Sequence, residues 1–309
     1  MKFTIGADPE FALINNNEEF VSAISILPDK KRAKKEKGNK FYYDNVLAEI
    51  GLKPSGSKVE FIENIKNSLQ SLKSMIGKNS IKIQASMEYS DEELKHKKSY
   101  DAGCFSEISA YTGKQIVFPK EFISKDKKTR HMMHVTNIRT AGGHIHLGSE
   151  QLVKDDNALY YTVKMLDLFL GVTDLFINKD ETSKRRRKIY GQVGSFRTPE
   201  YGVEYRTLSN YWLSSPVYAS LVYEICNFVL NFVEEESYWN FWDVTSDEKH
   251  ICFGYDNSLL MNNINKFNRK SSEKFLIFIL NYMPNYLAEL VQHAIDYKPS
   301  SLELEWSLK

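Results

Sequence analysis

Three segments of this 309-residue chain carry chemically reactive side chains at alternate positions, and this spacing constrains the fold more than any other feature. The pairs are Asp8 and Glu10, His144 and His146, and Glu204 and Arg206. Alternate residues of a β-strand point to the same side of the sheet. The segments therefore predict strands that present carboxylates, imidazoles and a guanidinium group on one face.

Several of these residues are candidate metal ligands. Two carboxylates that converge on one face, such as Asp8 and Glu10, repel each other unless a cation lies between them. Glu49 lies in an otherwise apolar stretch, and a carboxylate that faces a core is costly unless it is paired or binds a metal. Imidazole is an acceptable ligand in a site dominated by carboxylates. The candidate metal ligands are Asp8, Glu10, Glu49, His144 and Glu204.

Each segment also has a plainer interpretation. Asp8 and Glu10 could be solvated acids at a strand-edge turn, and Glu49 could face water on a half-exposed strand. Glu204 and Arg206 could form a cross-strand salt bridge, which is worth little when it is exposed. A lone histidine is usually structural, but two histidines at alternate positions between glycines favour a ligand-binding role.

Basic residues gather in two further segments. Residues 184–188 read Lys-Arg-Arg-Arg-Lys, and glycines and Arg197 follow them. Clustered guanidinium groups next to glycines suit a bidentate grip on phosphate oxygens, with a basic surface loop as the alternative. Residues 28–40 are also rich in lysine, so we expect a solvated loop or hairpin tip there, with a nucleotide or nucleic-acid contact as the alternative.

Strand-like segments are scattered among helical ones without regular βαβ spacing, which favours an α+β fold with a largely antiparallel sheet. We expect strands over 2–5, 11–14, 41–50, 81–89, 139–147 and 203–208, and helices over 59–76 and 158–170, the second stopped at Gly171. From about Pro216 the pattern becomes mainly helical. We therefore expect one catalytic domain over 1–309, with a sheet-based active-site core over 1–215 and a helical C-terminal region over 216–309.

Composition and charge argue against several classes of protein. Lys and Arg number 41 and Asp and Glu 40, so the net charge of +1 argues against a general nucleic-acid binder. No apolar run approaches the roughly 18 residues that span a bilayer, and the first residues show no apolar h-region or cleavage site, so we expect no signal peptide. The three cysteines form no disulfide framework and no paired zinc spacing. We expect a cytoplasmic protein.

The order and wording of these segments resemble the phage-type carboxylate–amine (COOH–NH2) ligase family, within the glutamine synthetase and glutamate–cysteine ligase superfamily. The matching segments are G-A-D-P-E-F at 6–11, D-N-x-x-x-E at 44–49, G-C at 103–104, R-x-A-G-G-H-I-H-x-G at 139–148, Y-G-x-x-G-x-x-R at 190–197 and G-V-E-Y-R-T-L-S-N-x-W at 202–212. The family usually continues after G-C with an acidic-Pro-acidic run, whereas this chain reads Phe105-Ser106-Glu107. Glu107 is expected to keep the acidic role there, with Glu88 as a weaker substitute.

The resemblance implies a curved, largely antiparallel sheet with flanking helices, like the glutamine synthetase catalytic domain. Its concave face would hold ATP and two or three Mg²⁺ ions, or Mn²⁺ in their place. By this resemblance Glu10 and Glu49 bind one metal, and Asp8, His144 and Glu204 bind another. Arg206 would contact the transferred phosphoryl group, Arg187 and Arg197 would contact phosphate or substrate, and His146 would support the nucleotide site.

The implied reaction joins a carboxylate to an amine through an acyl phosphate and releases ADP. The expected partners are carboxylate- and amine-bearing substrates, which could be an amino acid, a peptide or a protein terminus. The expected location is a bacterial or phage-infected cytoplasm. We expect neither a membrane nor a nucleic acid as a partner, and the resemblance is compatible with a homo-oligomer. Two alternatives stay open: a metal-dependent hydrolase that uses His144 and His146, and a non-catalytic protein that binds nucleotide or nucleic acid through 28–40 and 184–188.

Overall fold

A ten-stranded antiparallel sheet organises the chain in the computed structural model. The structure describes residues 3–102, 107–127, 132–235, 242–243, 251–252 and 255–309, and between 242 and 256 it describes only the backbone. The strands run in the order β3-β4-β5-β1-β12-β14-β13-β8, with β2 and β6 attached to β1. Their bounds are β1 Phe3–Ile14, β2 Phe20–Val21, β3 Lys34–Glu36, β4 Asn39–Asp44, β5 Leu47–Gly51, β6 Ser80–Lys82, β8 Ile108–Ser109, β12 Gly143–Ser149, β13 Ser195–Arg197 and β14 Gly202–Tyr205. The expected α+β class with a large antiparallel sheet is confirmed.

Strand β1 is the longest element of this sheet and corrects one prediction. It is continuous over 12 residues, whereas the sequence suggested two short strands around a turn. Strand β1 pairs with β12 up to residue 9 and with β5 at residues 10 and 11. Pro9 therefore lies at the point where β1 changes its partner. Proline cannot donate a ladder hydrogen bond, and this exchange of partners accommodates it inside a long strand.

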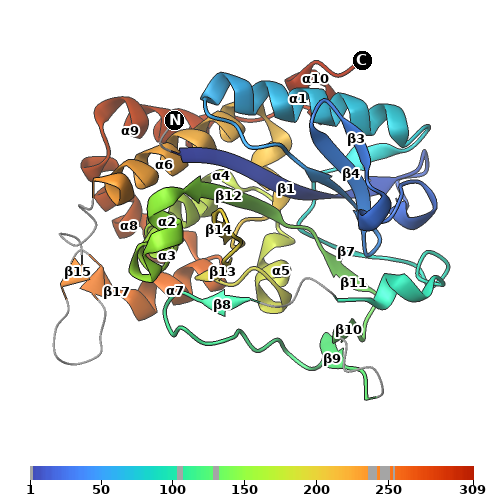
Figure 1. Cartoon of the computed structure of the whole chain (residues 1–309), viewed down its shortest axis with the longest axis horizontal. Coiled ribbons are helices and arrows are strands. Elements are labelled where there is room, and N and C mark those ends of the chain that lie inside the picture. The colour runs from blue at the N-terminus through green and yellow to red at the C-terminus, as the bar shows by residue number, and fades with distance from the viewer. Residues whose placement is uncertain (1–2, 103–106, 128–131, 236–241, 244–250, 253–254) are drawn as a thin grey trace.

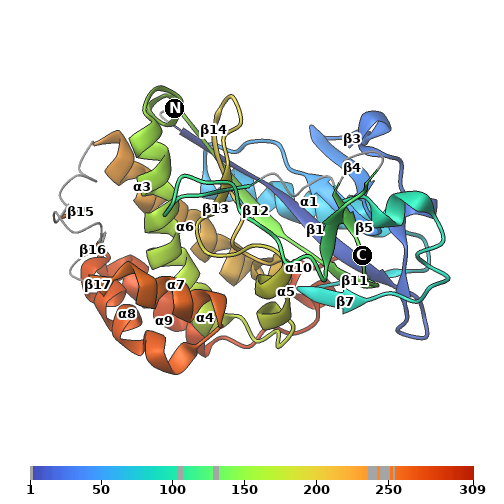
Figure 2. The same cartoon turned by 90° about the horizontal axis from the view of Figure 1, so that it is seen from below.

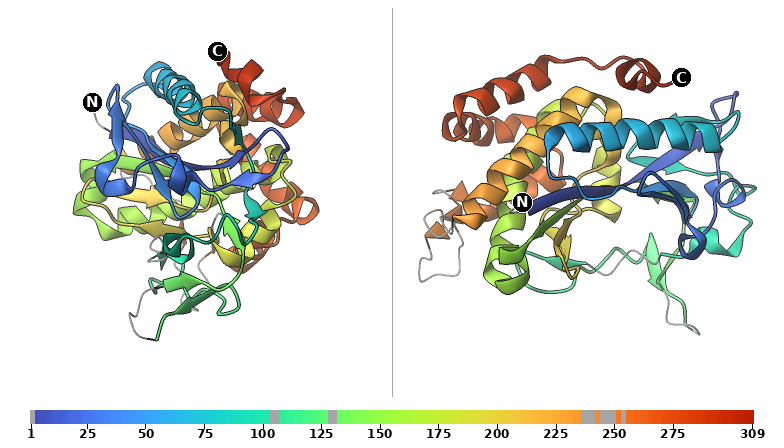
Figure 3. Two further views of the ribbon diagram at one scale, coloured as in Figure 1. Left: turned by 90° about the vertical axis from the view of Figure 1, so that its right-hand side faces the viewer. Right: turned by 45° about the horizontal axis from the view of Figure 1, so that its top comes forward.

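Helices cover one face of the sheet. The helices are α1 Lys58–Met75, α2 Glu150–Lys154, α3 Asp156–Leu166, α4 Val172–Ile177, α5 Ser183–Ile189, α6 Pro216–Glu234, α7 Asn257–Asn265, α8 Arg269–Tyr282, α9 Asn285–Asp296 and α10 Leu302–Trp306. Helices α1 and α6 lie along one side of β1 and β12, and the segment that carries β8 to β10 lies on the other side (Figures 1 and 3). The apolar alternate residues of the strands, such as Ile5, Ile145, Leu147 and Val203, are buried in the core on the helix side.

The predicted helix over 158–170 is longer than expected. Helix α3 continues through a π-helical turn, η4 (Asp167–Gly171), into α4, so Gly171 does not stop it. A Cβ atom at Gly171 would lie 3.3 Å from Ile264 Cδ1 and 3.4 Å from the Tyr205 hydroxyl oxygen. The glycine therefore serves close packing and not helix termination.

Three predicted strands are divided in the structure. The 41–50 stretch is the β4–β5 hairpin, because Asn45 adopts a left-handed backbone conformation with φ of 55° at its turn. The 81–89 stretch divides into β6 and β7 (Ser86–Glu88), and 139–147 divides into β11 (Ile138–Thr140) and β12. Strands β7 and β11 pair with each other beside the main sheet.

The remaining elements are short. They are β9 Ile123–Lys125, β10 Met132–His134, β15 Trp242–Asp243, β16 Ile251–Cys252 and β17 Tyr255–Asp256, with the 3₁₀ turns η1 Ala23–Ser25, η2 Lys30–Arg32, η3 Lys97–Tyr100 and η5 Asn210–Ser214. Helices α4, α7, α8 and α9 gather at one end of the molecule, away from β4 and β5 (Figure 2).

Helix α6 differs from the expectation that no apolar run approaches the length of a membrane span. It has 19 residues and is largely apolar, so by length and composition alone it is the one described helix that could cross a bilayer. In the structure α6 packs against α1, α3 and α9, as a core helix does. A single apolar helix of this kind is weak evidence for a membrane protein.

Candidate active site

The strand register brings the predicted site residues into one row across the sheet. The opposite pairs are Glu10 and Glu49, Asp8 and His144, His146 and Glu204, and Glu204 and Arg197. Cross-strand partners share a face and lie close together. Since the intervening residues face the core, the row occupies the face of the sheet opposite to α1 and α6.

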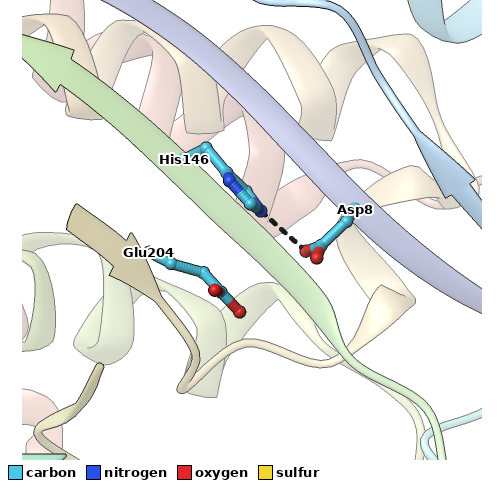
Figure 4. Close-up of side chains that lie close together, drawn as sticks. All are labelled: Asp8, His146 and Glu204. Atoms are coloured by element: carbon cyan, nitrogen blue, oxygen red, sulfur yellow. Dashed lines mark ion pairs between the residues drawn. The ribbon is translucent and has the colours of Figure 1, made fainter. Parts of the chain in front are cut away.

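Asp8, His146 and Glu204 form the first of two ligand groups, which we call the Asp8 group (Figure 4). One potential ligand atom from each residue lies within 4.8 Å of the other two. His146 Nε2 is 2.9 Å from Asp8 Oδ1, and the Tyr201 hydroxyl contacts the other ring nitrogen of His146. The three side chains come from three neighbouring strands, so the sheet itself fixes their spacing.

Glu10, Asp44 and Glu49 form the second group, which we call the Glu49 group, again with ligand atoms within 4.8 Å of one another. Glu49 Oε1 accepts a hydrogen bond of 2.5 Å from the Tyr42 hydroxyl, and Glu10 Oε2 accepts one of 2.5 Å from the Gly142 N–H. Glu10 and Glu49 are 5% and 2% exposed. The Tyr42 hydroxyl and the Gly142 N–H therefore hold these buried carboxylates in place.

The protonation of these carboxylates reflects their crowding. Burial and the neighbouring Asp44 raise the pKa of Glu10 to about 8, and the same two causes raise the pKa of Glu49 well above its usual range. Burial and Asp8 raise the pKa of Glu204 to about 7. Burial alone would raise the pKa of Asp8 as well, but His146 and His144 lower it well below its ordinary value. Buried acids that repel one another are stabilised by a cation between them.

Both groups fit hard divalent cations. Each supplies carboxylate oxygens, the ligands that Mg²⁺, Ca²⁺ and Mn²⁺ prefer. The buried Oε2 atom of Glu49 has no hydrogen-bond partner among the described residues, so it retains the capacity to bind an ion. The plainer interpretation of Glu49, a carboxylate that faces water, is wrong because the side chain is buried.

His144 also lies beside Asp8 and Glu204. Its Nδ1 atom is 3.8 Å from Glu204 Oε1, while His146 completes the group of ligand atoms with Asp8 and Glu204. His144 Nδ1 is 3.2 Å from Asp8 Oδ1, and His144 Nε2 is 3.2 Å from the Tyr190 hydroxyl. Burial and Arg206 lower the pKa of His144 to about 3, so the ring is neutral. Both ring nitrogens have hydrogen-bond partners, Asp8 and Tyr190.

A glycine makes the position of His144 accessible. A Cβ atom at Gly142 would lie 2.1 Å from His144 Nε2, so the ring lies where a larger residue would place its side chain. A Cβ atom at Gly143 would lie 2.4 Å from the Ser209 carbonyl oxygen. Gly142 thus leaves room for the His144 side chain, and Gly143 leaves room for the backbone at Ser209.

Arg206 lies at the centre of the site. It is 1% exposed, and its Nε donates to Glu107 Oε1 at 2.8 Å while its Nη1 contacts Glu204. The Tyr190 ring lies under the guanidinium group, 5.2 Å from ring centroid to Cζ. The predicted substitute acid Glu107 thus enters the site, whereas Glu88 is exposed and accepts a hydrogen bond from Asn137.

The other two predicted arginines lie apart from each other. Arg197 Nη1 is 3.9 Å from Glu204 Oε1 at the edge of the site. Arg187 lies on α5, where its Nη2 forms a buried ion pair of 2.8 Å with Asp174 Oδ2. The acidic partner of Arg187 thus lies outside the two ligand groups. The neighbouring Arg186 donates to the Thr207 and Arg206 carbonyl oxygens and supports the strand end that carries Arg206.

Several pockets adjoin this polar row, and three of them are large enough to matter for ligands. The first, which we call the glycine pocket, measures about 400 Å³ and is lined by Gly6, Gly51, Gly148, Asp8, Tyr42 and His146, among others. The second, the lysine pocket, measures about 450 Å³, and its lining includes Lys30, Lys31, Lys98, Asp29, Asp44 and Asp101. The third measures about 310 Å³ and lies beside Arg197 and Glu204.

Two contributions to the site escaped the interpretation of the sequence. Asp44 belongs to the D-N-x-x-x-E segment but was not selected as a ligand, because the hairpin that turns it back towards Glu49 was not predicted. Tyr190 was only part of a motif, although its hydroxyl and ring contact His144 and Arg206. The G-C segment at 103–104 lies outside the described residues.

Comparisons with known proteins bear on this site. Residues 131–272 match the model of a family described as "Phage phiEco32-like COOH.NH2 ligase-type 2". This match confirms the resemblance of the chain to the phage-type carboxylate–amine ligases.

Among solved structures, the fold is similar to a bifunctional glutathione synthetase from Pasteurella multocida, with a TM-score of 0.53 and 8% sequence identity. The alignment covers 99% of this chain and 48% of that one, so this chain spans about half the length of the synthetase. At this identity the likeness concerns the fold alone. No curated protein matches the sequence.

Proposed function

We propose that this protein is an ATP-dependent carboxylate–amine ligase that forms an amide or peptide-like bond through an acyl phosphate and releases ADP. The observation that carries the proposal is the pair of carboxylate-rich groups on one sheet face, with Arg206 held beside them. Carboxylates that hold divalent cations, next to arginines, are the equipment of nucleotide-dependent phosphoryl transfer. The family match over residues 131–272 supports the same reaction class.

We assign the fold to the glutamine synthetase catalytic-domain type, with a single catalytic domain. The support is an antiparallel sheet whose polar face carries the site and whose apolar face is covered by helices. The strands of this sheet all lie between residues 3 and 205, and helices predominate from Pro216 on. The proposed division into a core over 1–215 and a helical region over 216–309 follows this distribution.

The two groups would each hold a divalent cation, with Mg²⁺ as the ion expected for ATP chemistry and Mn²⁺ as its substitute. In the Glu49 group the ligands are Glu10, Asp44 and Glu49; in the Asp8 group they are Asp8, Glu204 and His146. We assign His144 the role of orienting Asp8, because both of its ring nitrogens are engaged. When bound, such cations neutralise phosphate charge and align the transferred group.

The nucleotide fits the glycine pocket best. This pocket adjoins Asp8 and His146, combines apolar surface from Leu52 and Pro54 with Lys40, and has a floor of glycines that lets a ligand approach the backbone. We place the carboxylate substrate in the lysine pocket, where Lys30, Lys31 and Lys98 provide ammonium groups and Asp29, Asp44 and Asp101 also line the space beside the Glu49 group. The two ligands would then meet along the polar row.

The residues of this chain would act mainly by position and charge. A carboxylate oxygen of the substrate attacks the γ-phosphorus, and the bond to the β,γ-bridging oxygen breaks as ADP leaves. Arg206 and Arg197 stabilise the negative charge on the transferring group. The amine nitrogen then attacks the acyl carbon, phosphate leaves, and the nitrogen loses a proton. Arg187 would support the site through its ion pair with Asp174 and not by touching phosphate.

Nucleotide product analysis tests the proposal. The protein is incubated with ATP, Mg²⁺ and pools of amino acids and amines, and ADP is separated from AMP. ADP that forms only when a carboxylate is present is the expected result. AMP would indicate adenylation and overturn the acyl-phosphate route. An absence of turnover together with an absence of ATP binding by calorimetry would favour the hydrolase or the non-catalytic binding protein.

A further inference from the structure

The lysine-rich segment 28–40 contains the expected hairpin turn, between β3 and β4, and its first residues are fixed beside the site. The turn η2 begins after Asp29, whose side chain accepts a hydrogen bond of 3.1 Å from the Arg32 N–H. The Tyr43 N–H donates to the Pro28 carbonyl oxygen at 2.9 Å, and Leu27 is buried in the core. These contacts anchor the segment along β4, next to the Glu49 group.

Lys30 is the residue of this segment that reaches the site. Its Nζ lies 3.9 Å from Glu49 Oε1 and 5.1 Å from the centroid of the Tyr42 ring. The Tyr42 hydroxyl donates to the same Glu49 oxygen. The Lys30 side chain is 68% exposed. Its ammonium group therefore lies over the Glu49 group on a flexible stem that can change its direction.

Lys30 also lies at the boundary of two pockets. It lines the glycine pocket together with Asp8 and His146, and it lines the lysine pocket together with Asp44 and Lys98. If the nucleotide occupies one pocket and the carboxylate the other, the γ-phosphoryl group crosses this boundary. Both reacting groups are anionic, so a cation at that point lowers their repulsion.

We propose that Lys30 is a further catalytic residue, which contacts the phosphoryl group as it passes from the nucleotide to the substrate carboxylate; this inference rests on the function proposed above. In the metal-free protein the ammonium group lies 3.9 Å from Glu49 Oε1. A divalent cation in the Glu49 group repels it, because like charges repel, and directs it towards the anionic ligands. Lys30 supplies charge and hydrogen bonds and neither gives nor takes a proton.

This role predicts two effects of opposite sign for Lys30→Met, which keeps an unbranched stem over Tyr42 and removes the charge. The kcat for carboxylate-dependent ADP formation falls about a hundredfold, as when one stabilising donor is removed from a transition state. The affinity for Mn²⁺ in the absence of nucleotide rises about two- to fivefold, since a competing exposed cation is gone. A residue that only supported the fold would not tighten metal binding.

The experiment compares the wild type, Lys30→Met, Lys30→Arg and Lys34→Ala by steady-state kinetics and by Mn²⁺ titration. Lys34→Ala is the control, because Lys34 is paired with the core residue Phe41 and so belongs to the other face of the hairpin. Lys30→Arg keeps the charge and should recover most of the rate. Thermal unfolding of each variant verifies that it is folded.

The outcomes separate the two proposals. An active wild type with Lys30→Met at the same kcat, or with unchanged Mn²⁺ affinity, overturns the role of Lys30 and leaves the ligase proposal standing. A wild type that binds Mn²⁺ but forms no ADP with any carboxylate overturns the ligase proposal, and the role of Lys30 falls with it.

Discussion

Glu49 is a buried carboxylate that the fold holds in place although it has no basic partner at its Oε2 atom among the described residues. We predict that Glu49→Gln lowers kcat at least about a hundredfold, because the Glu49 group loses an anionic ligand beside the reacting phosphate. In EDTA the variant should be as stable as the wild type or more so, since glutamine still accepts from Tyr42 and no charge is buried. Thermal unfolding and kinetics measure both effects; wild-type turnover would contradict the metal assignment.

Arg206 and Glu107 form an ion pair in which neither side chain is more than 1% exposed. Breaking a buried pair on one side leaves an uncompensated charge. We expect Arg206→Ala to lower the free energy of unfolding by about 3–5 kcal/mol, measured by urea denaturation. The double variant Arg206→Met with Glu107→Gln should recover much of this loss and stay inactive. A single variant of wild-type stability would show that the pair is not buried as described.

At the scale of elements, the turn into β12 carries two glycines with different duties. In Gly142→Ala the new Cβ meets the end of the His144 ring, which can rotate away but loses its contacts with Asp8 and Tyr190. In Gly143→Ala the Cβ meets the Ser209 carbonyl, which is backbone and cannot move alone. We expect Gly142→Ala to fold normally with at least about a tenfold loss of activity, and Gly143→Ala to lose stability. Urea denaturation and kinetics of the two variants provide the comparison, and equal stabilities would contradict it.

The spacing of residues in the sequence predicted the strands that carry the site, but not their register. Alternation showed that Asp8, His146 and Glu204 each share a strand face with a second polar residue. Only the pairing of β1, β12 and β14 shows that these three residues meet. His144 and His146 are indistinguishable by spacing, and their environments differ because Gly142 leaves room for one ring beside Tyr190. Such contacts depend on which strands pair and in which register, and the periodicity of residues along the chain does not reveal either.

Errors of element boundaries had local causes. The β4–β5 hairpin was missed because its turn consists of Asn45 and Val46 and lacks a glycine, so the stretch looked like one strand. The motif match implied a phosphate or substrate contact for Arg187, whereas in the structure Asp174 of α4 forms a buried ion pair with it. A basic cluster in a sequence does not reveal which of its members has a buried acidic partner.

At the scale of the whole molecule, Asp167 links the helical layer to the sheet. It is fully buried in η4 and accepts hydrogen bonds from the Tyr205 hydroxyl at 2.8 Å and the Thr207 hydroxyl at 3.2 Å. Burial raises its pKa to about 7, although these hydrogen bonds oppose the shift. An acid with a raised pKa in the folded state stabilises the fold below its unfolded pKa, and this contribution is lost as the pH rises through about 7.

We therefore expect Asp167→Asn to match the wild type at pH near 4 and to be more stable at pH near 8, by an amount on the order of a few kcal/mol. Urea denaturation across this pH range, in EDTA so that metal binding does not contribute, measures the difference. A stability difference that does not change with pH would show that Asp167 does not titrate in this range.

The central claim is that two groups of side chains on one sheet face bind divalent cations beside a nucleotide. Anomalous diffraction from crystals grown with Mn²⁺ and ADP tests it most directly. The account predicts one Mn²⁺ peak among Glu10, Asp44 and Glu49 and another among Asp8, His146 and Glu204. It also predicts nucleotide density in the glycine pocket. Manganese bound elsewhere, or nucleotide bound away from this face while both groups stay empty, would contradict the account.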